Sequence, residues 1–262
     1  NRVLYWRMTE SDYMAEAKVK SLQKALEILN CFIEEPMLGV TEISDKFGLY
    51  KSNVHNILST FKAMGYLEQD EASGKYKLGV QAFNLGYALK DTFSIIKICL
   101  PFMQDMANRS KQRVYLAIPY EREIYYLEAT YPIETVTLMR SVFGMKADYH
   151  CTGLGKAMLA YMPPDFISGI LSGRLHKYTD NTITSTEELK KELDITRQRG
   201  YAVDNMEHEF GIKCVSLPIR GTDGKVSAAL SISGSSRYFT EEKIEEYALI
   251  LKEDILEIEK RL

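Results

Sequence analysis

The chain has 262 residues, 45% of them hydrophobic and 26% charged, and a formal net charge of −3. Such values are ordinary for a globular protein with one large or two modest domains, and no stretch approaches the roughly 18 apolar residues that span a membrane. The small negative charge excludes a uniformly basic nucleic-acid binder, so any contact with nucleic acid must come from a local patch.

Residues 1–17 begin with Asn and lack the apolar core of about 7–15 residues that a secretion signal needs. We expect this segment to be disordered or to have been added to the natural chain, and to take no part in the fold. The cysteines are far apart, and no pair of them has the spacing of metal ligands. This usage indicates a reducing cytoplasm.

Helices are predicted over residues 21–33, 41–47 and 51–64, because apolar residues recur three and four positions apart in these segments. In the first helix, one apolar stripe consists of Leu22, Ala25, Leu26, Leu29 and Ile33. Ser21 and Thr41 are the expected N-caps of the first and second helices. Gly48 lies where the tight turn before the third helix needs a positive φ.

Two short strands, residues 66–69 and 75–78, follow on either side of a turn that contains Gly74. This pattern predicts a β-hairpin. Three helices followed by a hairpin are the arrangement of a winged helix-turn-helix. We therefore expect residues 18–79 to form a winged helix-turn-helix domain that binds DNA.

Residues 80–110 are predicted to be linker helices. Residues 80–90 are apolar nearly all round, and a second helix is expected over residues 93–110. A helix without a polar face needs apolar neighbours on several sides. We expect this connector to pack against a second copy of the chain, and docking on its own chain is the alternative.

The rest of the chain, residues 111–262, mixes strands and helices. Strands are predicted over residues 113–118, 124–131, 135–140, 201–204, 212–219 and 226–233, and helices begin near residues 153, 187 and 240. The dipeptide Asp223-Gly224 predicts a hairpin turn between the last two strands. We expect a mixed domain on one mainly antiparallel sheet, which puts the whole chain in the α+β class.

The third helix carries the residues expected to contact DNA. In a helix-turn-helix, the first residues of the second helix meet base edges in the major groove. Residues 50–64 contain two lysines and no acid, which suits a groove lined by phosphates. The predicted contacts are Tyr50, Lys51, Ser52, Asn53, His55 and Asn56, with a backbone N–H from Thr41 and a hairpin contact from Lys75.

Several motifs resemble the IclR family of bacterial transcription regulators. They lie at residues 19–29, 48–55, 78–79, 150–157, 200–214 and 229–234, and so span nearly the whole chain after residue 18. The resemblance implies a winged helix-turn-helix joined by a helix to a GAF-like effector-binding domain. It also implies dimers or tetramers, a small organic acid or related metabolite as effector, and repression more often than activation.

The chain departs from the family at two positions expected to read DNA. Tyr50 stands where the family usually has Pro, and Asn56 stands where it often has Arg. Loss of a basic residue at position 56 would weaken a phosphate or guanine contact. The operator is therefore not expected to match that of a relative.

The predicted effector site combines the start of the helix near residue 153 with two neighbouring strands. Free N–H groups at a helix start favour a carboxylate, and alternate residues of a strand share a face. By the resemblance, the pocket positions are Gly153, Leu154, Asp204, Ile212, Cys214, Ser231 and Ser233, with Met139 and Ala147 on the apolar side. Asp204 would repel a carboxylate, so we expect it to bind a ligand hydroxyl or to anchor its loop.

Other sites can be drawn from the same residues. Cys214, His208 and Asp204 could act as nucleophile, base and orienting acid, but the sequence does not place them in contact. Residues 153–157 lack the full pattern of a phosphate-binding loop. The group His150, Cys151, His176 and His208 has no metal-ligand spacing. We therefore expect no catalytic residue, no metal and no cofactor.

The leading hypothesis is a cytoplasmic, homo-oligomeric repressor whose affinity for double-stranded operator DNA is set by a small organic acid. No membrane contact is expected. The alternative is a metabolite-sensing module that acts through a protein partner and uses its helical N-terminal domain for docking.

Overall fold

The computed structural model describes residues 18–134 and 142–262. The chain divides into two compact units, Asn1–Phe93 and Ser94–Leu262, and each has its own hydrophobic core. The predicted linker, residues 80–110, comprises two helices, of which the second belongs to the second unit. No helix in the described ranges is both long and apolar enough to cross a membrane.

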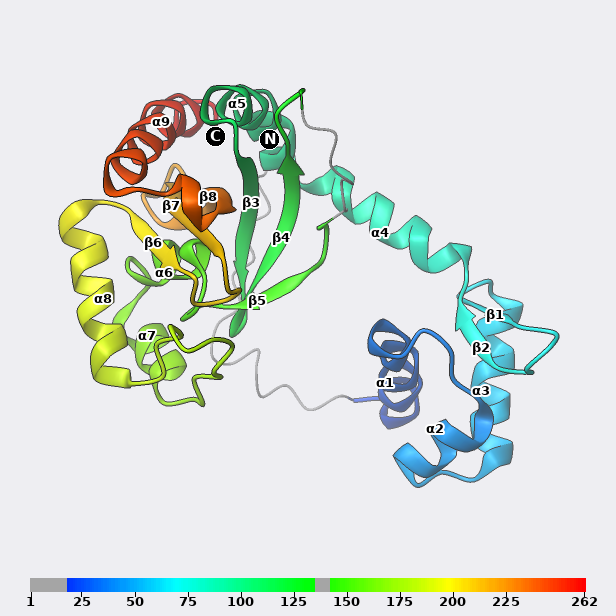
Figure 1. Cartoon of the computed structure of the whole chain (residues 1–262). Helices are drawn as coiled ribbons and strands as arrows, with labels where there is room; N and C mark the ends of the chain where they lie inside the picture. The colour runs from blue at the N-terminus through cyan, green and yellow to red at the C-terminus, as the bar shows by residue number, and fades with distance from the viewer. Residues whose placement is uncertain (1–17, 135–141) are drawn as a thin grey trace. The chain divides into compact units, whose positions relative to one another are not determined.

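The first unit is a winged helix-turn-helix, as predicted (Figure 1). Its elements are α1 (Lys20–Glu34), α2 (Val40–Phe47), α3 (Lys51–Ala63), β1 (Leu67–Gln69), β2 (Tyr76–Leu78) and α4 (Val80–Thr92). The two strands pair antiparallel and form the wing. Gly48 ends α2 with φ 62°, a conformation that glycine adopts without strain.

Most of the apolar stripe of α1 does not face the core, although Leu29 packs against it. Ile28 and Phe32 are the buried side chains of this helix, whereas Leu22 and Ile33 are 55% and 74% exposed. The helix carries apolar residues on two faces, and periodicity does not say which face meets the core. The core of this unit consists of Ile28, Phe32, Leu38, Ile43, Val54, Leu58, Leu67 and Tyr76.

Two predicted helix caps are also wrong. Val19 and Gly39, rather than Ser21 and Thr41, hold the N-cap positions of α1 and α2. At α2 the Glu42 carboxylate accepts a hydrogen bond of 2.6 Å from the Gly39 backbone N–H. A side chain three residues into the helix thus serves the end that Thr41 was expected to cap.

The second unit is built on one six-stranded sheet in the order β5-β4-β3-β8-β7-β6, with every neighbouring pair antiparallel. The strands are β3 (Arg113–Tyr120), β4 (Glu123–Thr130), β5 (Lys146–Asp148), β6 (Ala202–Asn205), β7 (Ile212–Arg220) and β8 (Val226–Ser235). The helices are α5 (Ser94–Ser110), α6 (Gly153–Leu159), α7 (Pro164–Leu171), α8 (Thr186–Arg199), the short η2 (Ser236–Tyr238) and α9 (Glu241–Glu259). The predicted antiparallel sheet is confirmed.

Helices cover both faces of this sheet (Figure 1). α5 and α9 pack together on one face, whereas α6 lies against β6, β7 and β8 on the other and contacts α8. Three elements, β5, α7 and η2, were not predicted. β5 has three residues, too few for a pattern of alternation. The strand predicted at residues 135–140 lies outside the described residues.

Candidate functional site

The start of α3 presents a row of polar side chains to solvent. Tyr50, the N-cap residue, is 82% exposed, and the side chains of Lys51, Ser52, Asn53, His55 and Asn56 are exposed as well. Val54 and Leu58 are buried on the opposite face and fix the helix in the core. Within the described part of the chain, Lys51 has no ion-pair partner. A helix held in this way offers its polar face to a groove.

Of the two other predicted DNA contacts, Thr41 is exposed at a helix start, whereas Lys75 is engaged in an ion pair. Thr41 is exposed in the first turn of α2, where backbone N–H groups have no partner within the helix. Lys75 on the wing forms a 2.6 Å ion pair with Glu42, and this lysine holds the pKa of Glu42 below its usual value. Lys75 can bind a DNA phosphate if it gives up its ion pair with Glu42.

A cavity of about 170 Å³ opens in the second unit between the start of α6 and the strands of the sheet. Its lining includes Gly153, Leu154, Asp204, Ile212, Cys214, Ser231 and Ser233, which the sequence analysis had brought together. Ala147 is buried in β5 and is not part of the lining. Met139 lies outside the described residues.

The register of the sheet explains why these residues meet. Cys214 on β7 stands opposite both Asp204 on β6 and Ser233 on β8. The Cys214 Sγ lies 3.1 Å from the Ser233 Oγ and 3.8 Å from an oxygen of Asp204. Side chains on one face of neighbouring strands are adjacent, so the three form one polar wall of the cavity.

Glycine lets α6 approach this wall. A Cβ on Gly153 would lie 2.5 Å from the Ser216 Oγ, and a Cβ on Gly155 would lie 2.4 Å from the carbonyl oxygen of Tyr149. The helix is capped by Thr152, whose Oγ1 accepts a hydrogen bond of 3.0 Å from the Gly155 N–H. The first turn of α6 can therefore pack closely against β7 and Tyr149, and its residues Gly153 and Leu154 form the floor of the cavity.

Two cations of the cavity were missed by sequence reasoning. Arg113, the first residue of β3, and Lys146, on β5, both line the cavity. Lys146 pairs with Glu123 at 3.2 Å. The Arg113 guanidinium has no hydrogen-bond or ion-pair partner among the residues described. Arg113 stands opposite Ser233 in the sheet. Its place in the cavity therefore follows from the pairing of β3 with β8, which the sequence alone does not reveal.

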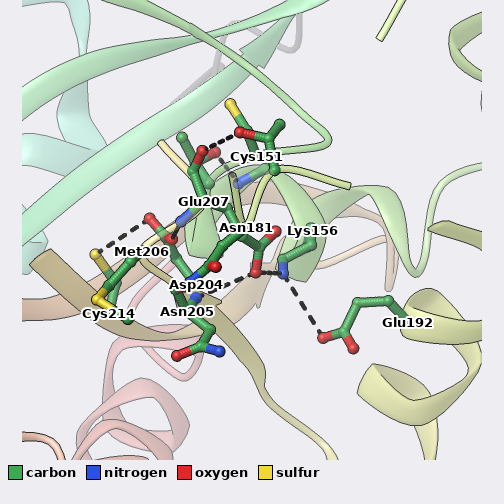
Figure 2. A network of polar contacts seen from close by, with 12 residues as sticks. Cys151, Lys156, Asn181, Glu192, Asp204, Asn205, Met206, Glu207 and Cys214 are labelled. Atoms are coloured by element: carbon green, nitrogen blue, oxygen red, sulfur yellow. Dashed lines mark hydrogen bonds and ion pairs between the residues drawn. The ribbon is translucent and has the colours of Figure 1, made fainter. Parts of the chain in front are cut away.

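A buried polar network lies behind the cavity (Figure 2). Lys156 on α6 is fully buried, and its Nζ lies 2.5 Å from Glu207 Oε1 and 3.7 Å from Glu192 Oε1. The Glu207 N–H donates to Asp204 Oδ1 at 2.7 Å. Burial raises the pKa of Asp204 to about 7 and also raises the pKa of Glu207. With a pKa of about 7, the Asp204 carboxyl group in the cavity wall can donate a hydrogen bond to a ligand when it is protonated.

The possible catalytic triad is not assembled, because the His208 ring contacts Cys151 rather than Cys214. His208 Nδ1 lies 3.6 Å from Cys151 Sγ, whereas Cys214 contacts Ser233 and Asp204. Burial raises the pKa of the Cys214 thiol well above its usual range. A protonated thiol without an adjacent base is a poor nucleophile.

Comparisons with known proteins match both units. The family model described as "IclR helix-turn-helix domain" matches residues 21–71, and the model "Bacterial transcriptional regulator IclR C-terminal" matches residues 88–259. The chain is 34% identical over 236 residues to the HTH-type transcriptional regulator KdgR of Escherichia coli (strain K12), with 89% of each protein covered. It is 29% identical over 245 residues to the transcriptional repressor IclR of the same organism, covering 91% of this chain and 88% of that protein.

Solved structures of the family contain the same two folds. The IclR of Thermotoga maritima is 36% identical, with a TM-score of 0.72 over 92% of this chain and 98% of that chain. An IclR homologue from Microbacterium hydrocarbonoxydans, crystallised in complex with 4-hydroxybenzoate, is 25% identical, with a TM-score of 0.76 over 92% of this chain and 98% of that one.

Proposed function

The chain belongs to the IclR family of bacterial transcriptional regulators, and from this premise we propose that it is a repressor whose operator affinity is controlled by a small organic acid bound in the cavity of the second unit. The family consists of DNA-binding regulators rather than enzymes, which confirms that the chain is a regulator and not a catalyst. Such a regulator acts on double-stranded DNA in the cytoplasm.

The unpartnered guanidinium of Arg113 carries the proposal for the effector. A cation that lines a cavity and lacks an anionic partner in the described chain is suited to a carboxylate, which it can bind through two parallel hydrogen bonds. Ser231 and Ser233 add hydroxyl groups beside it. A cavity of about 170 Å³ suits a small acid with polar substituents. The homologue bound to 4-hydroxybenzoate, itself a small acid, supports this choice.

DNA recognition is assigned to the exposed start of α3. Asn53 and Asn56 present amides that can pair with adenine in the major groove. Lys51 adds a cation free to contact a phosphate. The free N–H groups of α2 at Thr41 and the wing lysine Lys75 extend the contact to the backbone.

The proposed regulator is a homodimer or a tetramer. Apolar side chains stand exposed on two helices of the first unit, including Leu22 and Ile33 on α1 and Phe83 and Tyr87 on α4. Burial of such side chains against a second copy is favourable. A two-fold dimer places two copies of α3 on DNA and therefore reads a roughly palindromic operator.

Control by the effector follows from linkage. An acid that binds one arrangement of the protein more tightly than another shifts the population toward that arrangement, and operator affinity changes by the same coupling free energy.

Fluorescence anisotropy with DNA that flanks the gene of this protein tests the proposal. We expect sequence-dependent binding that weakens as salt is raised and weakens further when one member of a panel of small carboxylic acids is added. A folded protein that binds no DNA at any salt concentration would instead favour the alternative of a sensing module with a protein partner. DNA binding that responds to amines or neutral sugars, and to no acid, would reject Arg113 as the effector anchor.

A further inference from the structure

A second opening in the second unit, a cleft of about 630 Å³, lies beside the edge strand β6 and is lined also by residues of α8, β7 and α9. Asp204 on β6 lines the cavity already described, whereas its neighbours Val203 and Asn205 line the cleft. Successive side chains of a strand point to opposite faces of the sheet. The cavity and the cleft are therefore separate sites on the two sides of β6.

The charged side chains of the cleft fall into a paired and an unpaired set. Arg199 pairs with Glu192 at 2.8 Å, and Glu207 pairs with the buried Lys156 behind the cleft. The unpaired set has no ion-pair or hydrogen-bond partner for its side chains among the residues that the structure describes, and it consists of Lys213, Glu241 and Glu245. The cleft thus offers one positive and two negative charges to a ligand.

One oxygen of Glu207 is also buried without a partner. The residue is only 4% exposed. Its Oε1 accepts hydrogen bonds from the Lys156 ammonium and, at 3.1 Å, from the Asn205 N–H, whereas its Oε2 accepts none within the described chain. A buried carboxylate oxygen without a donor is costly. A ligand that brings an N–H donor into the cleft, which Glu207 lines, can supply the missing bond.

The unpaired charges stand on different elements. Glu241 and Glu245 are four positions apart on α9, so they share a face of the helix and repel each other. Lys213 lies on β7, where it stands opposite Asn205 of β6. The dipole of α9 favours an acid at position 241, in its first turn, but it does not compensate Glu245 or the buried oxygen of Glu207. A cation bound in the cleft would compensate all three.

We propose that the cleft binds a basic amino acid, with its carboxylate on Lys213 and its two cationic groups on the acids. A simple carboxylic acid would meet Lys213 but be repelled by Glu241 and Glu245, and a diamine would leave Lys213 without a partner. A molecule with two positive charges and one negative charge matches the unpaired set charge for charge. Val203 and Ile244 supply apolar surface for the methylene groups of its side chain.

The proposed site is connected to the wall of the effector cavity (Figure 2). The N–H of Glu207 donates a hydrogen bond to Asp204 Oδ1, and Asp204 lines that cavity. Asn181, which lines the cleft, donates a hydrogen bond of 2.9 Å to the carbonyl oxygen of Asn205. An amino acid held by Glu207 therefore acts on a side chain that faces the effector. The site in the cleft is inferred independently of the identity of that effector.

Isothermal titration calorimetry of the full chain with three related compounds tests the proposal. L-Lysine carries both cationic groups and the carboxylate, cadaverine lacks the carboxylate, and L-norleucine lacks the side-chain ammonium group. We expect one L-lysine per chain. Each of the two other compounds should bind at least about tenfold more weakly, because each loses charge-assisted hydrogen bonds.

Substitutions then assign each charge of the ligand to its partner. Lys213→Gln should make L-lysine bind no better than cadaverine, and Glu241→Gln combined with Glu245→Gln should make it bind no better than L-norleucine. Glu242→Gln is the matched control, because Glu242 is an exposed acid of the same helix turn and lies outside the lining. Its affinity for L-lysine should equal that of the wild type.

The affinity of Arg113→Gln for L-lysine separates the cleft from the effector cavity, which Arg113 lines. We expect this affinity to be unchanged. The proposal is overturned if L-lysine does not bind, if the three compounds bind equally, if Glu242→Gln weakens binding as much as the double variant, or if Arg113→Gln abolishes it. Because Glu241 and Glu245 are exposed, the double variant decides the matter even if Lys213→Gln fails to fold.

Discussion

The Nζ of Lys156 lies 2.5 Å from Glu207 Oε1, and both side chains are buried, the lysine completely. This ion pair ties α6, which forms the floor of the cavity, to the turn that follows β6. The second acid near Lys156, Glu192, is itself paired with Arg199 at 2.8 Å. Lys156 and Glu207 therefore depend mainly on each other for compensation of their charges.

Lys156→Met is expected to lower the free energy of unfolding by about 3–5 kcal/mol, because it leaves a carboxylate buried without its cation. Urea unfolding followed by circular dichroism measures the loss. The double variant Lys156→Met with Glu207→Gln removes both charges and should recover more than half of it. A single variant as stable as the double would mean that Glu207 is not held as a buried anion.

Asp204 should make stability depend on pH. Its pKa is raised from 3.8 to about 7 in the folded protein, so the folded state retains the proton that the unfolded state loses. Stability from this group is fully present below about pH 4, declines as the pH rises and is lost above about pH 7. Asp204→Asn should remove this decline, so that the wild-type chain loses about 1–3 kcal/mol more than the variant between pH 5 and pH 8.

Thermal unfolding at several pH values measures this difference. Glu207 has a pKa raised in the same direction, so the wild-type decline alone does not identify Asp204. Parallel pH profiles for the wild type and Asp204→Asn would show that Asp204 ionises in the folded state as readily as in the unfolded chain.

Arg113→Gln is expected to weaken binding of the acid effector about 10–100-fold, the range for loss of a charge-assisted hydrogen bond. Isothermal titration calorimetry gives the affinity, and the operator affinity without effector should stay unchanged. Arg237→Gln is the matched control, because Arg237 is an exposed arginine just beyond β8 and lies outside the cavity lining. Equal effects of the two substitutions would point to long-range charge rather than to a contact.

Lys51→Ala combined with Asn53→Ala should abolish operator-specific binding in a protein that remains folded, since both side chains are exposed. Lys51→Ala alone should reduce the slope of log affinity against log salt by about 1, as expected for one phosphate contact. Anisotropy titrations at several salt concentrations give both values. A double variant with unchanged operator affinity would show that α3 is not the recognition helix.

Local patterns in the sequence predicted most elements of the fold. The hairpin from β7 to β8 follows from Asp223-Gly224 between two apolar runs, and α9 follows from its long stripe and its cap at Thr240. Where two faces of a helix are apolar, as in α1, the pattern did not identify the buried face. The buried face of α1 is the one that packs against side chains of the other helices, such as Ile43 and Leu58.

The candidate sites were predictable to the extent that their residues share one strand or one helix start. Ser231 and Ser233 were placed together by alternation alone, whereas Arg113 was missed because its place beside Ser233 depends on the pairing of β3 with β8. Cys151 and His208 are 57 positions apart. The fold alone brings them into contact, so no rule on sequence spacing could have predicted that they meet.

Gly155→Ala is expected to destabilise the second unit by about 3 kcal/mol, because the new Cβ would lie 2.4 Å and 2.5 Å from backbone atoms of Tyr149. Gly169→Ala in α7 is the control. A Cβ there meets nothing within 4 Å, and alanine is the better helix former by about 0.5–1 kcal/mol. Urea unfolding of both variants should give shifts of opposite sign.

The two glycines at the start of α6 also limit how this protein can evolve. Because Gly153 and Gly155 admit no larger side chain without displacing Ser216 or the backbone of Tyr149, substitution of these glycines is not a route to a cavity that accepts a new molecule. Changes in what the protein senses must come from the walls, where Arg113 and Lys146 can be replaced without moving the main chain. A descendant of this protein would then acquire a new effector by replacing the charged residues of the cavity walls while both glycines of α6 are kept.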